Sequence, residues 1–212
     1  MSRAFERFAG ACAALVALGG VGYAIAFVIT VGSAPRAASY ASSLFLLTGG
    51  LVSLVVMIAL YQRLRLTDPS FALLGLLLGV AGALGSSIHG GFDLAVLVKR
   101  PAYSDVYFPA NTVDPRGLLT FGFTALALLV IAYLILHGGA LPRRLGHLGL
   151  IGGILLIVVY LGRLIVLNPK SPGLLTAAVL SGFIVNPLWF LWVARILWRG
   201  ESVPAAPVVP AP

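Results

Sequence analysis

Three ionisable side chains near the ends of long apolar runs are the residues of this sequence best suited to chemistry. His89 and Asp93 are four residues apart at the end of one run, and Arg163 lies at the end of another. Residues four apart share one face of a helix, and ionisable groups at membrane depth need a partner or water. The sequence therefore predicts an ion pair between Asp93 and Arg163 that holds two helices together, with His89 hydrogen-bonded nearby.

Two other arrangements of these residues stay open. In the first, they line a small polar pocket on the outer side that binds a ligand or a proton, together with Tyr160 and Ser86, each one helical turn away. In the second, the charged groups extend separately into the interface and never meet. Asn186, which precedes Pro187, is expected about 21 Å in from the outer side at the helical rise per residue, and it is the deepest member of the candidate pocket.

A row of small residues precedes the histidine on the same helical face. Gly75, Gly79, Gly82, Ser86 and His89 follow one another at spacings of four or three residues. Small residues in this pattern let a second helix approach closely within a membrane. We expect the three glycines to pack against another helix of the same chain, with contact to a second subunit as the alternative.

The composition of the chain identifies the elements that must position these residues. Of 212 residues, 60% are apolar and 9% are charged, whereas an ordinary soluble domain has roughly a quarter charged. Apolar segments long enough to cross a bilayer lie near 8–31, 41–61, 70–98, 117–137, 146–167 and 173–198. The sequence predicts an all-α polytopic bundle of six transmembrane helices over residues 1–200, followed by an extended or disordered tail, rich in proline and alanine, over residues 201–212.

The net charge of +8 fits a membrane better than a nucleic acid. Its cations flank the apolar runs rather than forming a stripe on one element, which favours anionic lipid headgroups as their partners. Eight of the 14 Lys and Arg residues fall on the side of the two termini and six on the other. Because cytoplasmic loops carry the excess of Lys and Arg, we expect a multi-pass protein of the cell membrane with both termini in the cytoplasm.

The remaining reactive residue types do not form a recognisable site. The three histidines are His89, His137 and His147, and the single cysteine, Cys12, lies in the first apolar run. Their spacing matches no metal site, phosphate-binding loop or nucleophilic triad. We therefore expect no metal, no cofactor and no catalytic residues.

Local signals also predict how the helices begin and where they meet the interface. Asp68 before Pro69 and Ser171 before Pro172 place a capping side chain next to a proline at the first helical position. A belt of interfacial aromatic residues is predicted near the end of the last run, formed by Trp189, Trp192 and Trp198. The aromatic residues of the 99–116 loop predict a second belt on the outer side.

Two stretches of the chain resemble a known family. They run from Leu60-Tyr61-Gln62-Arg63-Leu64 to Asp68-Pro69-Ser70-Phe71-Ala72-Leu73-Leu74, and from His137 to Gly146, which ends in Leu-Pro-Arg-Arg-Leu-Gly. The chain is similar here to a family of bacterial integral membrane proteins of unknown function with a Leu-Pro-Arg-x-Leu-Gly turn, although Gly138 stands where a serine is expected. The resemblance implies a helical bundle, and it implies no activity or site residues.

Two classes of function fit these features. The first is a non-catalytic accessory or structural subunit of a membrane complex or homo-oligomer, favoured by the short loops and the row of glycines. The second is a small transporter, channel or ligand sensor with an outward-facing polar pocket, which needs a polar path into the membrane. A transporter predicts a water-filled cavity that reaches Asn186, whereas a subunit predicts a dry bundle with an apolar outer face complementary to another protein.

Overall fold

The computed structural model describes residues 1–33, 36–99, 117–165 and 171–200, with the side chains of residues 30–33 and 163–165 left out. The described chain forms the following helices: α1 (Arg3–Ser33), α2 (Arg36–Leu64), α3 (Pro69–Lys99), the π-helix η1 (Leu118–Phe123), α5 (Thr124–Gly138), α6 (Arg143–Ile165), α7 (Pro172–Val179), the π-helix η2 (Leu180–Val185) and α8 (Asn186–Arg199). They make six helical spans that are long and apolar enough to cross a membrane. The predicted all-α bundle of six transmembrane helices is confirmed.

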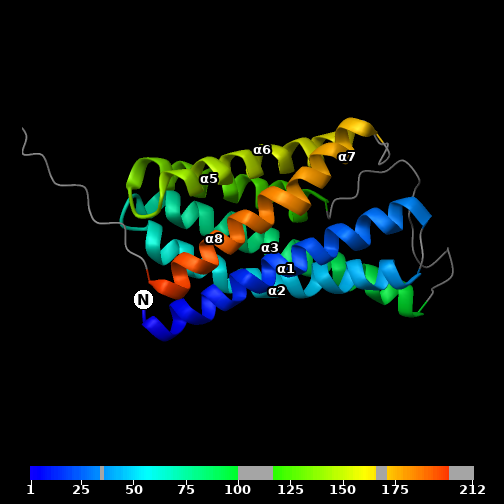
Figure 1. Ribbon diagram of the computed structural model, residues 1–212, viewed down its shortest axis with the longest axis horizontal. Helices are drawn as coiled ribbons and strands as arrows, with labels where there is room; N and C mark the ends of the chain where they lie inside the picture. Colours follow the sequence, from blue (N-terminus) through cyan, green and yellow to red (C-terminus); the bar gives the residue numbers. More distant parts are fainter. Residues whose placement is uncertain (34–35, 100–116, 166–170, 201–212) are drawn as a thin grey trace, which may run out of the picture.

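The six spans lie roughly parallel along the long axis of the molecule (Figure 1). α2 packs against α1 and α3, and α1 also packs against α8. α5 packs against both α3 and α6. The beginning of α1 and the end of α8 lie together at one end of the bundle, where Arg3 donates hydrogen bonds to the carbonyl oxygens of Leu197 and Trp198. We call this end the terminal end, and the opposite end, which carries Arg36 and Lys99, the distal end.

The closely packed core belongs mainly to the terminal half of the bundle. Its largest fully buried side chains are Val56, Leu60, Leu64, Leu134, Ile135, Leu145, Trp189, Val193, Ile196 and Leu197. Other leucines are exposed, as at Leu18 and Leu77, and face the lipid at no cost because bilayer hydrocarbon is as apolar as they are. The large buried side chains thus concentrate in the terminal half, and a smaller buried cluster, Val159, Leu174 and Ala177, lies in the distal half.

Trp189 corrects one of the expectations from the sequence. Its side chain is 1% exposed, so it is a core residue and not part of an interfacial belt. It lies one helical turn from Val193 and shares its buried face. Trp198, which is 56% exposed, occupies the position expected of a belt residue. The 99–116 loop lies outside the described residues except for Lys99.

The predicted start of α3 is confirmed in atomic detail. Asp68 Oδ1 accepts hydrogen bonds from the backbone N–H groups of Ser70 at 2.9 Å and Phe71 at 3.0 Å. These N–H groups have no partner inside the helix, so the carboxylate supplies one. Ser171 makes no such side-chain bond at the start of α7, where Pro172 alone marks the first turn.

We expect Asp68→Ala to destabilise the protein by about 1 kcal/mol, because an alanine cap leaves both N–H groups without an acceptor. Asp68→Asn keeps a side-chain oxygen at the same place and is the matched control, with an expected change close to zero. Unfolding by SDS titration in detergent micelles measures both variants. Equal losses for Ala and Asn would show that the charge, and not the cap, matters at this position.

Both π-helices lie in the distal half of the bundle. Pro187 lies inside the last span, and the structure has η2 immediately before it, where the backbone N–H of Asn186 bonds to the carbonyl oxygen of Ser181 five residues earlier. Proline removes a backbone donor, and one wider turn is a common accommodation in such a helix. η1 contains no proline, and nothing in its sequence predicted it.

Candidate functional site

His89 and Asp93 lie together, as their spacing predicts. His89 is 7% exposed, and its Nε2 lies 3.5 Å from Asp93 Oδ2. On the other side of the ring, His89 Nδ1 lies 3.2 Å from the hydroxyl oxygen of Thr120 in η1. The side chain of Arg163 lies outside the described residues, so its ion pair with Asp93 stays a prediction.

The other candidate residues separate into two groups. Ser86 and Asn186 line one cavity near the middle of the bundle. The hydroxyl of Ser86 donates to the carbonyl oxygen of Gly82 at 2.9 Å, and the amide nitrogen of Asn186 donates to Ser181 Oγ at 3.3 Å. Tyr160 is half-buried and lies beside Gly122; it lines neither the central cavity nor the distal pocket described below.

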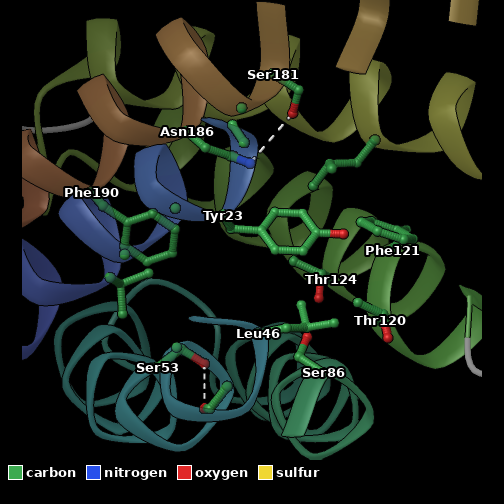
Figure 2. Close-up of a pocket in the computed structure, with 18 of the residues that line it drawn as sticks. Tyr23, Leu46, Ser53, Ser86, Thr120, Phe121, Thr124, Ser181, Asn186 and Phe190 are labelled. Atoms are coloured by element: carbon green, nitrogen blue, oxygen red, sulfur yellow. Dashed lines mark hydrogen bonds between the residues drawn. The ribbon is translucent and has the colours of Figure 1, made fainter. Parts of the chain in front are cut away.

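The central cavity has a volume of about 230 Å³ and receives residues from all six spans. Figure 2 shows its wall, with the ring of Tyr23 crossing it and the phenol hydroxyl directed toward Phe121. Its polar lining residues all carry neutral groups: Tyr23, Ser53, Ser86, Thr120, Thr124, Ser181 and Asn186. Its aromatic lining residues are Tyr23, Phe27, Phe45, Phe121, Phe183 and Phe190. Among the lining residues that the structure describes, none is charged.

Glycines and the two π-helices create this cavity. Among the described atoms, nothing lies within 4 Å of the place that a Cβ of Gly20 or Gly49 would occupy, and both residues line the cavity. η1 contributes Thr120 and Phe121 to the wall, and η2 contributes Ser181. Because Gly20 and Gly49 have no side chains, the space beside them stays open. Larger residues elsewhere keep the neighbouring helices from closing it.

A second pocket, of about 320 Å³, lies at the distal end between α1, α2 and α3. His89 and Asp93 line it together with the hydroxyl residues Ser39, Ser42 and Ser43. It shares Tyr23, Phe27 and Leu46 with the central cavity, so these three side chains form the common wall. His89 spans the two spaces, because it lines the distal pocket and contacts Thr120 of the central cavity.

The row of glycines on α3 faces other helices of the same chain. A Cβ at Gly75 would meet Val130 of α5 in ordinary contact at 3.4 Å, and one at Gly79 would meet the flexible side chain of Met57. A Cβ at Gly82 would meet the backbone of Thr124 at 2.9 Å. Of the three, Gly82 makes the close backbone approach.

Sequence reasoning missed several residues of the central cavity, among them Tyr23, Ser53 and Thr120. Each is a hydroxyl residue inside an apolar run, which is the only signal that could have found it. That signal is weak, because serine and threonine in membrane helices commonly bond to a carbonyl of their own helix. Which of them face one cavity depends on how six helices pack.

The fold and its cavity define the class: a multi-pass helical membrane protein with an internal, largely apolar cavity. Comparisons of the chain with models of protein families, with curated proteins and with solved structures find no match. The resemblance to a family of bacterial membrane proteins therefore stays a prediction. Within the described residues, no three His, Cys, Asp or Glu side chains gather where they could hold a metal ion.

Proposed function

We propose that the protein is a non-catalytic protein of the cell membrane, with both termini in the cytoplasm, that binds a small uncharged lipophilic molecule in its central cavity. The observation that carries this proposal is the lining, which is apolar apart from neutral hydroxyl and amide groups. Moving a charged ligand from water into such surroundings is strongly unfavourable. A ligand that already partitions into the bilayer loses little on entering.

The packing of the distal half supports entry from the membrane. α1 packs against α2, α8 and η2, whereas α7 packs against α6 and η2. Both helices nevertheless contribute to the cavity wall, α1 through Ala24 and Val28 and α7 through Leu175 and Val179. We infer that the ligand passes between α1 and α7, where apolar side chains face the lipid.

This proposal takes the ligand-sensor alternative over the accessory subunit that the sequence first suggests. A protein that only packs against a partner gains nothing from a void at its centre, since each missing side-chain contact lowers stability. The cavity reaches Asn186, and its lining is largely apolar, whereas a transporter was expected to have a water-filled cavity there. Its apolar lining disfavours a route for ions, which need continuous polar groups or water.

The proposal predicts that filling the cavity abolishes binding. Gly20→Leu places an isobutyl group in the open space beside Gly20, so the ligand should be lost while the fold is retained. Native mass spectrometry of protein extracted from its own membranes measures the retained molecule, and thermal unfolding measures stability with and without it. The expected loss of affinity is at least about 100-fold, since the variant side chain and the ligand cannot occupy the same volume.

Gly173→Leu is the matched control. Gly173 lies in the first turn of α7, is exposed, and no described atom lies within 4 Å of its Cβ position. The same change there should leave ligand binding intact. A wild-type protein that retains no molecule, and gains no thermal stability from lipophilic probes, would contradict the proposed function.

A further inference from the structure

The hydroxyl groups on one wall of the central cavity have already used their protons within the protein. Ser53 Oγ donates to the carbonyl oxygen of Gly50 at 2.7 Å, and Ser86 Oγ donates to that of Gly82 at 2.9 Å. A hydroxyl group has one proton and two acceptor lone pairs. Both serines can therefore offer only acceptor lone pairs to a ligand.

The neighbouring His89 makes the hydroxyl of Thr120 an acceptor toward the cavity as well. A neutral histidine carries its proton on one ring nitrogen, and the group beside the other nitrogen decides which one. The carboxylate of Asp93, 3.5 Å from His89 Nε2, favours the proton on Nε2. His89 Nδ1 is then an acceptor, so the Thr120 hydroxyl donates to it across 3.2 Å and keeps its lone pairs for the cavity.

These three hydroxyls lie on the wall formed by α2, α3 and η1. Figure 2 shows Ser53, Ser86 and Thr120 on this side of the cavity, and Asn186 with Ser181 on the opposite side. We call the three residues the acceptor wall. Asn186 donates one amide N–H to Ser181, so its second amide N–H is a hydrogen-bond donor on the side of the cavity opposite the acceptor wall.

We propose that the cavity selects a lipophilic alcohol or phenol, whose hydroxyl group donates to Thr120 in the acceptor wall. This inference rests on the proposed function and adds the chemical class of the ligand. A ketone or quinone of the same shape would turn its carbonyl lone pairs toward those of Thr120 and the serines. Since that contact is repulsive and leaves buried acceptors without a donor, the carbonyl compound binds more weakly.

Two probes that differ in one group test the inference. Cyclododecanol and cyclododecanone have the same ring, and one carries a hydroxyl where the other carries a carbonyl. At neutral pH we expect the wild-type protein to bind the alcohol about three to ten times more tightly, the effect of one hydrogen bond. The two probes compete for the cavity in one detergent. Thermal stabilisation and native mass spectrometry measure the competition and give both affinities.

Variants at Thr120 and Asp93 show whether these residues produce the preference for the alcohol. Thr120→Val keeps the shape and removes the hydroxyl, so the ratio of the two affinities should fall toward one, whereas Thr120→Ser should keep it. Asp93→Asn removes the charge that sets the His89 proton, and its amide can donate to Nε2. Thr120 then donates into the cavity, and the preference should disappear or reverse.

Failure of the inference and failure of the proposed function give different results. If the wild-type protein binds both probes equally, or the ketone more tightly, and Gly20→Leu removes both, the ligand class is wrong and the cavity still binds. A preference that persists in Thr120→Val also overturns the inference. If neither probe binds, or if Gly20→Leu leaves their binding unchanged, the proposed function itself is wrong.

Discussion

Gly50→Ala is expected to destabilise the bundle by about 2–3 kcal/mol, the upper part of the range for overpacked sites. A Cβ at this position would lie 2.5 Å from the carbonyl oxygen of Ala83 and 2.9 Å from the backbone nitrogen of Ser87, both on α3. Backbone atoms cannot rotate away as a side chain does. The added methyl group must therefore separate α2 from α3, the pair that packs most extensively in the molecule.

The neighbouring glycine provides the control for this prediction. No described atom lies within 4 Å of a Cβ at Gly49, so Gly49→Ala adds a methyl group without a clash. Alanine is about 1 kcal/mol more favourable than glycine inside a helix, and this variant should be as stable as the wild-type protein or slightly more so. SDS unfolding titrations of both variants measure the difference. Similar stabilities would show that the two helices do not approach as closely as described.

Gly50 also shows what the row of glycines could and could not predict. The spacing of Gly75, Gly79 and Gly82 indicates which face of α3 is narrow, because period and face are linked in a helix. It does not indicate the partner or the closeness of each contact. A Cβ at Gly90 would lie 2.5 Å from the backbone nitrogen of Leu47, an approach as tight as that at Gly50, and neither residue belongs to the predicted row.

The six spans were predictable and the central cavity was not, for a physical reason. Long apolar runs must be helical in a bilayer, since an open backbone has no hydrogen-bond partner there. The contact of His89 with Asp93 follows equally from local geometry, as the two residues are four apart on one helix. Thr120 contacts His89 from η1, on a different span, and the sequence gives no sign that these two residues meet. The cavity lining comes from all six spans, so it can be predicted only once the packing of all six helices is known.

The ion pair between Glu6 and Arg63 at the terminal end could not be predicted from the sequence either, because 57 residues separate its members. Glu6 lies 2.7 Å from Arg63 of α2 and 3.0 Å from Arg3 of its own helix. The Arg63 and Glu6 side chains are 15% and 14% exposed, whereas that of Arg3 is 43% exposed. The pair between Glu6 and Arg63 is thus the better shielded from water, and it fastens α1 to α2.

We expect Glu6→Gln and Arg63→Gln each to destabilise the protein by about 2 kcal/mol. An exposed pair contributes at most about 1 kcal/mol, and breaking a fully buried pair costs about 3–5 kcal/mol, so a pair with this exposure lies between them. Arg3→Gln should cost less, because water solvates its guanidinium group.

The double variant Glu6→Gln with Arg63→Gln distinguishes the pair from the separate effects of its members. Each single change leaves one charge without its partner in a poorly hydrated site, whereas the double change leaves neither. Its loss of stability should therefore be smaller than the sum of the single losses by about 1 kcal/mol or more. Strictly additive losses in SDS unfolding would mean that the two side chains act independently. A coupling of the expected size would identify the pair between Glu6 and Arg63 as a contact that holds α1 against α2 at the terminal end.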